Sequence, residues 1–518
     1  MKARAAEEAA VGLRAAEGAD AEPDGGDDDA PLSAAAADPF LRMTPMHRMA
    51  LIGVFGVYFV AAAALAFATE APGAEWFIPG LALLVAVRVF PLVAHPEYGW
   101  FHPVVLTGLL SLRPLLQEFP AYAFGLRTHA ALANMDPERL GALQGWKLTL
   151  MAMGVVAYYA GFRWGFRLPV PRLAFPEVRR PGPKALAAVA FSVAVFQFYV
   201  TRKGGLNAYM LTWARGRSTA LGGNYYWFTL IGLGMMACLL WFALERRAVF
   251  RPLFWAAAGM AVTVQFLSMG SRGSVFYGFV VAFMVWMLRE RKIPVIRFLA
   301  LGVVGMVALG VLGNLRKSTW NGSVDWSTVT DFSARETLRS SSLPELVERR
   351  TTMDSNLPIL ASVPQRVELL YGASYAAVVT LPIPRGLWPG KPGMLGGKIG
   401  RLFFGMSAGV PATGVGEAYW NFHIPGVLLV FFLFGVFHKW LAAVVAAYGH
   451  RPAMILIYAM VMWVAHDPCS DAAVAIMFSV FPLLVLAALF GALRRGRGAS
   501  QGAGDALPAR RPLLVSWR

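Results

Sequence analysis

The chain has 518 residues, of which 57% are hydrophobic and 15% charged, and its mean hydropathy is +0.53. This much apolar surface excludes a soluble globular protein of this length and indicates a polytopic, all-α membrane protein. The net charge is +17, but no nucleic-acid-binding motif accompanies it. We therefore assign the positive charge to orientation in the bilayer and to an anionic ligand, and predict no nucleic-acid partner.

The two ends of the chain differ in charge. Residues 1–40 consist largely of Ala, Glu, Asp and Gly with almost no large apolar side chains, so we predict a disordered acidic cytoplasmic tail. The first apolar run begins at Met49, and we expect it to act as its own insertion signal. Residues 493–518 are expected to form a basic cytoplasmic tail.

Between the tails, apolar runs recur at about the length that crosses roughly 30 Å of hydrocarbon. The twelve runs are 49–69, 76–94, 101–118, 144–162, 185–201, 226–244, 252–269, 274–288, 296–315, 424–443, 453–466 and 473–492. The run 101–118 contains Arg113 and Pro114, so it is either a broken span or a re-entrant segment. The charges of the later loops decide between these alternatives.

Short basic loops follow several of these runs. If 101–118 crosses the membrane, the loops 163–184, 245–247, 289–292 and 494–495 all face the cytoplasm, as the positive-inside rule expects. We therefore predict a membrane domain of about twelve helices with both termini cytoplasmic.

This topology leaves two large outer loops within the membrane domain 41–492, at residues 202–225 and 316–423. In the second loop, Ser341–Glu345 resembles a helix start, and 366–377 has the spacing of a short amphipathic helix.

Five arginines fall on the outer side in this topology: Arg202, Arg215, Arg217, Arg272 and Arg385. A single arginine there can contact phospholipid headgroups, which is our interpretation of Arg202. Several arginines on three outer segments suggest a polyanion, because the guanidinium group binds phosphate through two parallel hydrogen bonds. A pyrophosphate at the membrane surface is the natural ligand.

Gly270–Gly273, with the sequence GSRG, joins two predicted spans. It is either a simple glycine turn or an anion site in which Arg272 and the N–H groups of Gly273 and Ser274 lie at a helix N-terminus.

The segment 382–392, PIPRGLWPGKP, is rich in proline and glycine. Such a backbone fixes the directions of Arg385, Trp388 and Lys391. The tryptophan is either an interfacial anchor or a surface on which a sugar ring stacks beside a phosphate.

The segment 414–423, GVGEAYWNFH, leads directly into the predicted span 424–443. Glu417 has no basic neighbour in the sequence, so it is a helix cap, an ion-pair partner of an arginine, or a general base that accepts a proton from a hydroxyl.

Near the start of the last span, Ser470 or Asp471 is the expected N-cap, and His466 is an alternative base or phosphate ligand. The outer segments lack metal-ligand spacing, so we expect neither a catalytic metal nor a cofactor.

Together, GSRG, PIPRGLWPGKP and GVGEAYWNFHIPG resemble motifs of the oligosaccharide repeat unit polymerases of the Wzy or O-antigen polymerase type, in their order and their sidedness. The segment GGLNAYMLTWARGRS adds a fourth match. The resemblance covers about residues 185–490.

The resemblance implies an inner-membrane glycosyltransferase with an all-helical, GT-C-like architecture and a periplasmic active site. Its substrates would be oligosaccharides linked to undecaprenyl diphosphate, joined into O-antigen or exopolysaccharide without a metal and with inversion at the donor carbon. A chain-length regulator and a flippase would be partners, besides membrane lipids.

Several residues acquire roles from the same resemblance. Arg272 and Arg385 would bind the diphosphate, with Arg215 or Arg217 completing the clamp. Glu417 would be the base, with His466 and Asp354 as reserves. The remaining predicted substrate-binding residues, three of which would shape the sugar subsites, are Trp388, Lys391, Tyr419, Trp420 and Asn421.

Two other functions remain open. An O-antigen ligase would use a similar donor, and ligases carry a functional histidine in the late outer loop. The corresponding loop of this chain has His423 as its only histidine, which favours a polymerase. A flippase or other transporter would place charged groups at mid-membrane, whereas few fall inside the predicted spans.

Overall fold

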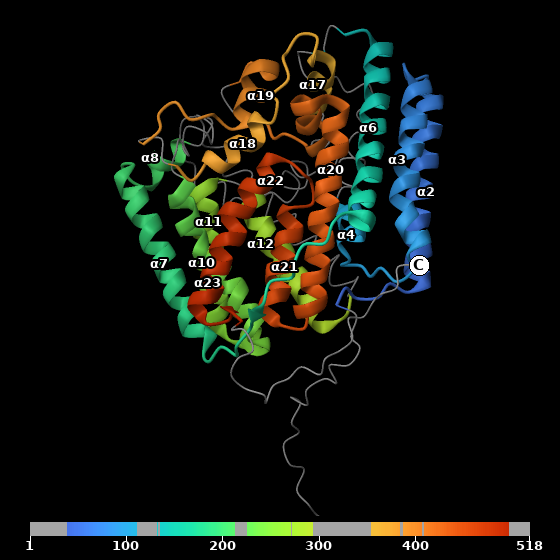
Figure 1. The fold of residues 1–518 in the computed structure, drawn as a ribbon. Helices are drawn as coiled ribbons and strands as arrows, with labels where there is room; N and C mark the ends of the chain where they lie inside the picture. The colour runs from blue at the N-terminus through green and yellow to red at the C-terminus, as the bar shows by residue number, and fades with distance from the viewer. Residues whose placement is uncertain are drawn as a thin grey trace, which may run out of the picture. The chain divides into compact units, whose positions relative to one another are not determined.

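The computed structural model describes residues 39–110, 132, 135–212, 225–270, 272–293, 354–383, 387–406 and 409–496. The predicted tails 1–40 and 493–518 therefore lie almost entirely outside the described residues. The described part is a bundle of α-helices with one pair of very short strands (Figure 1).

The first half of the bundle runs through α2 (Pro45–Ala68), α3 (Ala74–Ala94), α4 (Pro103–Leu110), α6 (Pro137–Trp164), β1 (Leu173–Ala174), α7 (Pro181–Arg202), α8 (Leu206–Leu211), α10 (Tyr225–Leu244), the 3₁₀ turn η2 (Arg246–Phe250), α11 (Pro252–Met269) and α12 (Arg272–Glu290). The second half contains α17 (Asn356–Ser362), α18 (Ala373–Thr380), α19 (Leu395–Phe404), α20 (Gly414–Tyr448), α21 (Pro452–Val464), α22 (Ser470–Ala475), the π-helical turn η4 (Ile476–Val480), α23 (Phe481–Phe490) and β2 (Arg494–Arg495).

Seven helical stretches in the described residues are long and apolar enough to cross a membrane, and α11 and α21 are shorter apolar helices. This confirms an all-α, multi-pass membrane protein. Helices occupy the predicted spans wherever the structure describes them, although α4 covers only the start of 101–118. The rest of that run and the span 296–315 lie outside the described residues, so the number twelve stays a prediction.

The direction of the helices supports a crossing between α3 and α6. Both helices begin at the same end of the bundle, because a Cβ on Gly141 would lie 2.1 Å from the Pro72 carbonyl oxygen. The chain after α3 is at the other end, where the Trp100 N–H donates to the Leu41 carbonyl at 3.0 Å. The end of α3 and the start of α6 therefore lie at opposite ends of the bundle, which is the arrangement that the charge argument requires.

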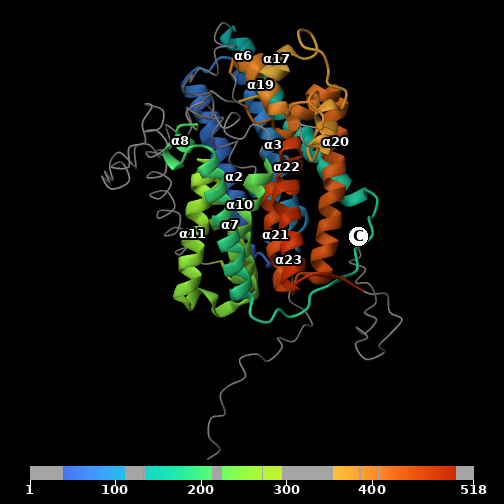
Figure 2. The ribbon, with the colours of Figure 1, turned by 90° about the vertical axis from the view of Figure 1, so that its left-hand side faces the viewer.

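The two ends of the bundle differ in content. One end carries α8, α17, α18 and α19, and we call it the loop end; the strands β1 and β2 lie at the other, which we call the strand end (Figures 1 and 2). The basic stretches at the end of α6, the start of α7 and the end of α12 all lie at the strand end. This grouping agrees with the predicted cytoplasmic side.

Small residues bring α6 and α20 into close contact. A Cβ added to Gly161 would lie 1.9 Å from the Phe432 carbonyl oxygen, and one added to Gly435 would lie 2.1 Å from the Tyr158 carbonyl oxygen. Glycine at such positions lets two membrane helices approach to backbone contact, where van der Waals packing stabilises them.

We expect Gly161→Val to separate α6 from α20 and to cost at least about 1–3 kcal/mol of folding free energy, the usual range for overpacking. The measurement is the melting temperature of the purified protein and its level in the membrane. Gly56→Val in α2 is the matched control, because a Cβ there would meet nothing within 4 Å. Equal melting temperatures for the two variants would contradict the packing argument.

Helix α20 is kinked where the sequence predicted a boundary. Phe422 (φ −144°, ψ 21°) and His423 (φ 58°, ψ −148°) are not helical, and they separate residues 414–421 from the long arm that begins at Ile424. The two arms are close, because a Cβ on Gly426 would lie 2.3 Å from the Ala418 carbonyl oxygen. A new helical arm thus begins at Ile424, the residue at which the predicted span starts.

The expected helix 366–377 is only partly correct. Tyr371 (φ 47°) and Gly372 (φ 86°) adopt the left-handed conformation, and α18 begins only at Ala373. The N–H groups of Leu370 and Tyr371 donate instead to the carbonyls of Trp420 and Asn421, at 3.0 and 3.1 Å. Hydrogen bonds to α20 therefore replace the first turns of the expected helix.

Candidate functional site

Glu417 lies at the loop end, in the first turns of α20, and its side chain is fully buried. One carboxyl oxygen, Oε2, accepts a hydrogen bond of 2.7 Å from the Ser470 N–H. The other, Oε1, is buried without a hydrogen bond of normal geometry from the described residues. Because Ser470 is the first residue of α22, the carboxyl group occupies the positive end of that helix, where negative charge is stabilised.

A second carboxyl group makes the reciprocal contact. Asp467 Oδ2 accepts a hydrogen bond of 2.8 Å from the Gly414 N–H, at the start of α20. Burial raises the pKa of the Asp467 carboxyl, and the hydrogen bond from Gly414 opposes this shift. The N-termini of α20 and α22 thus each donate a backbone N–H to a carboxyl group from the other segment.

The predicted N-cap of the last span, Ser470 or Asp471, is wrong. The residue that precedes α22 is Cys469, and its side chain makes no capping hydrogen bond. Ser470 is already helical, and its N–H is satisfied by Glu417 rather than by a neighbouring side chain. A long-range cap therefore replaces the local one that the sequence suggested.

Asn421 ties α18 to α20. Its Nδ2 donates to Ser374 Oγ at 2.7 Å and to the Glu417 carbonyl at 2.8 Å, and its Oδ1 accepts from the Gly372 N–H at 2.9 Å. Its side chain is fully buried. We predicted Asn421 as a substrate ligand, but its contacts are those of a residue that positions α18 over Glu417.

Trp420 is also internal. It is fully buried, its Nε1 donates to the Glu368 carbonyl at 3.0 Å, and its ring packs edge-on against Phe403. The Lys398 ammonium lies 5.3 Å from the ring centre. These contacts fix the short arm of α20 and leave no face of the indole exposed for a sugar.

The other predicted binding residues at the loop end differ in exposure. Tyr419 is buried, and its hydroxyl lies 2.7 Å from His423 Nε2. His466 is half-buried, with Nδ1 2.7 Å from the Trp463 carbonyl oxygen, to which it donates. Trp388 is 42% exposed. Trp388 is therefore the best placed of the predicted aromatic residues for stacking with a sugar.

Lys391 holds the loop around Arg385. Its ammonium donates to the Leu381 carbonyl at 3.0 Å and to the Ile383 carbonyl at 2.8 Å. The hydroxyl of Tyr226, at the start of α10, donates to the Pro382 carbonyl between them. Arg385 itself lies outside the described residues. The backbone just before Arg385 is thus held by hydrogen bonds from both Lys391 and Tyr226.

Arg272 is the first residue of α12, and Gly270 (φ 56°) ends α11, so the predicted tight hairpin is confirmed. The side chain of Arg272 lies outside the described part of the structure, as do Arg215 and Arg217. Arg202, at the end of α7, is exposed, with its guanidinium 4.9 Å from the ring centre of Phe198. Its exposure fits the predicted contact with headgroups.

Described residues that flank the arginine-bearing segments are hydrogen-bonded to one another at the loop end. The Tyr209 hydroxyl in α8 donates to the Ser268 carbonyl, two residues before the GSRG turn. Tyr226, which follows the first outer loop, contacts the PIPRGLWPGKP segment through Pro382. The first outer loop is therefore joined on one side to the turn that contains Arg272 and on the other to the loop that contains Arg385.

An ion pair that the sequence analysis did not predict joins α6 to the residues just before α17. Lys147 Nζ, in α6, is 2.8 Å from Asp354 Oδ2; the lysine side chain is fully buried and the aspartate side chain is 14% exposed. Asp354 Oδ1 also accepts a hydrogen bond of 2.9 Å from the Asn356 N–H, at the start of α17. Asp354 is thus engaged as a counter-ion, which argues against its use as a reserve base. The sequence did contain one signal for this ion pair: Lys147 lies inside a predicted span, where a charged side chain needs a partner of opposite charge.

His438, in the long arm of α20, is a further buried group that the sequence did not single out. Its Nδ1 lies 2.9 Å from the Tyr158 hydroxyl, and its Nε2 lies 3.1 Å from the Ala465 carbonyl oxygen. With Nε2 as donor to the carbonyl, Nδ1 accepts from the tyrosine. The histidine joins α6 to the segment that carries Asp467.

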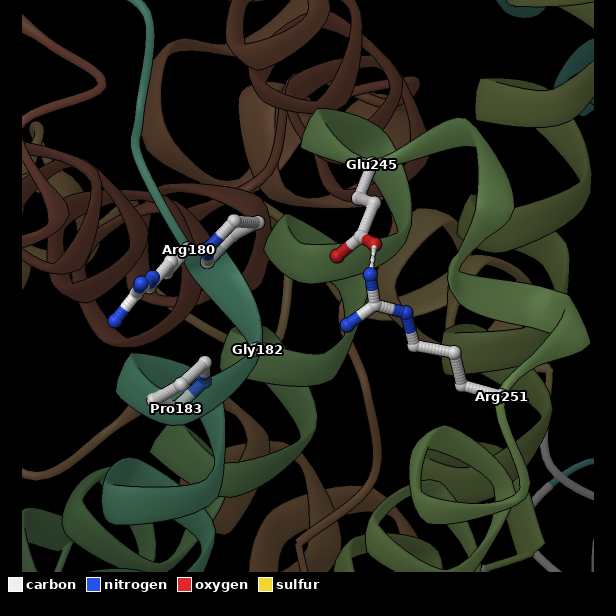
Figure 3. Close-up of a pocket in the computed structure, with 6 residues that line it drawn as sticks. Arg180, Gly182, Pro183, Glu245 and Arg251 are labelled. Carbon is white, nitrogen blue, oxygen red and sulfur yellow. Dashed lines mark ion pairs between the residues drawn. The ribbon is translucent and has the colours of Figure 1, made fainter.

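A cavity of about 500 Å³ lies at the other, strand end of the bundle. It is lined by the start of α7 and, on the other side, by Glu245 and Arg251, which form an ion pair of 2.5 Å (Figure 3). Arg180 lies on the opposite wall, with its guanidinium pointing away from this pair (Figure 3). None of the predicted site residues lines this cavity.

No protein-family model matches the chain, and neither a curated protein nor a solved structure matches it. The function is therefore inferred from the chain's own residues and contacts. Among the described residues, no group of three or more His, Cys, Asp or Glu side chains is arranged to hold a metal ion.

Proposed function

We propose that the protein joins oligosaccharide repeat units linked to undecaprenyl diphosphate into O-antigen or exopolysaccharide on the periplasmic face of the bacterial inner membrane. The observation that supports the proposal is that described residues flanking the three arginine-bearing outer segments are hydrogen-bonded to one another, through Tyr209 and Tyr226, at the end of the bundle where Glu417 is buried. The basic strand end would then be cytoplasmic.

The reaction is a transfer of the glycosyl group between two oxygens. A hydroxyl of the acceptor unit attacks the anomeric carbon of the donor and forms a new carbon–oxygen bond, while the bond from that carbon to the phosphate oxygen breaks. Glu417 accepts the proton of the hydroxyl, and undecaprenyl diphosphate leaves with the bonding electrons. Arg272, Arg385 and either Arg215 or Arg217 stabilise the charge that develops on the diphosphate. No metal takes part in these steps.

The described residues around this reaction have three kinds of role. Trp388 offers an exposed ring to a sugar next to Arg385. Asn421 and Trp420 hold the short arm of α20 and the start of α18 in place. Lys391 fixes the backbone just before Arg385. Tyr419 and His466 line the same end of the bundle, and His466 stays the alternative base.

The arginines give the direct test in a cell that makes the polymer. Arg272→Ala and Arg385→Lys are each expected to reduce the ladder of long chains at least about tenfold, because each removes a bidentate phosphate contact. The readout is the ladder on a gel at equal protein levels. Arg202→Ala is the matched control and is expected to keep the ladder. Normal ladders from both site variants would rule out the diphosphate clamp.

A further inference from the structure

The part of the chain around α18 lacks charge but exposes apolar side chains. No charged residue occurs in 369–384, a stretch of sixteen residues that includes α18. Three large apolar side chains near and just beyond its end are accessible: Val379 is 77%, Ile383 38% and Leu387 80% exposed. We call these three side chains the apolar edge. Exposed apolar side chains gathered in one segment mark a contact with lipid or with another molecule.

The backbone N–H groups beside the apolar edge are satisfied within the same segment. The N–H of Leu381 donates to the Val378 carbonyl at 3.1 Å, and the N–H of Ile383 donates to the Thr380 carbonyl at 3.0 Å. Pro382, between them, has no N–H group. Residues 381–383 therefore leave no backbone donor unpaired.

The carbonyl groups of the same three residues are satisfied by two long side chains. The Lys391 ammonium donates to the carbonyls of Leu381 and Ile383, at 3.0 and 2.8 Å, and the Tyr226 hydroxyl donates to the Pro382 carbonyl. On a surface in contact with solvent, water can satisfy such carbonyls, whereas next to lipid the protein itself must do so. The complete pairing of 381–383 therefore fits an apolar environment.

Tyr226 also fixes the level of the apolar edge along the bundle. It is the first residue of the apolar span Tyr226–Leu244, and its ring centre lies 6.3 Å from that of Phe478, inside the span Ser470–Phe490. The Tyr226 hydroxyl thus holds Pro382 at the level where α10 begins to cross the membrane. An apolar side chain that is exposed at this level meets lipid rather than bulk water.

We propose that the apolar edge inserts into the lipid leaflet at the loop end of the bundle, at the boundary between headgroups and acyl chains. The irregular backbone after α18 keeps it at this boundary, because such backbone is not exposed to lipid deeper in the hydrocarbon. Trp388, which follows Leu387 and is 42% exposed, lies at the headgroup level, where amphipathic rings settle. The inference does not rest on the proposed function. Under that function, a lipid-linked donor meets Trp388 at the depth of its own phosphate groups.

The test measures the depth of single spin labels in the full-length protein, reconstituted in liposomes of phosphatidylethanolamine and phosphatidylglycerol. Cys238→Ala and Cys469→Ser remove the native thiols, and Val379→Cys or Leu387→Cys carries the label. Power saturation of the electron paramagnetic resonance signal compares collisions with oxygen and with a polar nickel complex. Both side chains are exposed, so each substitution keeps the core and the two sites report independently.

Two reference sites calibrate the ratio of oxygen to nickel collisions. Val57→Cys, in the middle of α2 and at a side chain that is 71% exposed, reports lipid. Glu368→Cys, at an exposed charged residue just before the uncharged stretch, reports water. We expect labels at 379 and 387 to give ratios at least about threefold above the Glu368 value, because apolar oxygen concentrates in lipid and the polar complex in water.

Each result decides the proposal. A ratio at either site equal to that of Glu368→Cys would show that the apolar edge faces water and would overturn the insertion. Low collision rates with both reagents would show that protein covers the edge, from a second copy or from another chain, and would overturn it as well. Neither result would bear on the polymerase function, which is tested by the arginine variants.

Discussion

Replacing Glu417 with glutamine is expected to slow polymerisation at least about a hundredfold, because removal of a general base usually costs between 10² and 10⁴ in rate. The amide has nearly the shape of the carboxyl group, and its oxygen can still accept the hydrogen bond from the Ser470 N–H. It cannot accept a proton from the acceptor. We therefore expect wild-type protein levels and a wild-type melting temperature together with almost no long chains. The measurement is the initial rate of unit joining in reconstituted membranes.

Glu368→Gln is the matched control for this variant. Glu368 is exposed in the segment next to α18, and its backbone carbonyl, which the substitution keeps, accepts the hydrogen bond from Trp420. We expect Glu368→Gln to keep the wild-type rate. A fully active Glu417→Gln would mean that Glu417 serves only to cap α22, and the base would have to be sought at His466.

Lys147→Met is expected to have the largest effect on stability. Removing one partner of a buried ion pair leaves the other charge without compensation, which typically costs about 3–5 kcal/mol. Here the lysine is fully buried while Asp354 retains 14% exposure, so we expect the lower part of that range. The loss also releases the segment before α17 from α6. A large fall in melting temperature and in membrane level is the predicted result.

Two comparisons separate this effect from a general intolerance of substitution. The double variant Lys147→Met with Asp354→Asn is expected to recover much of the lost stability, because no uncompensated charge remains. Arg251→Met removes an exposed partner, with 57% of the arginine side chain accessible, and is expected to cost less than about 1 kcal/mol. A double variant as unstable as Lys147→Met alone would contradict the ion-pair argument.

The positions of the described apolar helices could be predicted from sequence because they depend on local properties. Apolar runs placed α10, α11 and α12 closely, and glycines placed the tight turn at Gly270. The start of the span at Ile424 followed from the change of composition after His423. Hydropathy and turn chemistry depend on a few neighbouring residues, so they can be recognised in the sequence without knowing how the helices pack.

The partners of the site residues could not be predicted in the same way. Glu417 bonds to Ser470, and Lys147 bonds to Asp354, which is 207 residues away in the sequence. Such pairs depend on how helices pack, and no local pattern encodes them. For the same reason the sequence did not distinguish Trp420, which is buried, from Trp388, which is 42% exposed.

The short helices of the long loop show the same limit. Amphipathic spacing over 366–377 predicted one continuous helix, but the backbone of Leu370 and Tyr371 is bonded to α20 instead. Periodicity reports which side chains prefer burial. It does not report whether another segment competes for the backbone hydrogen bonds.

The most direct measurement supplies purified full-length protein in liposomes with an undecaprenyl-diphosphate-linked repeat unit and follows both products. We predict a ladder of joined units, with one undecaprenyl diphosphate released for each unit added, without added metal, and loss of both products with Glu417→Gln. A repeat unit that stays single, or that crosses the bilayer without being joined, would contradict it.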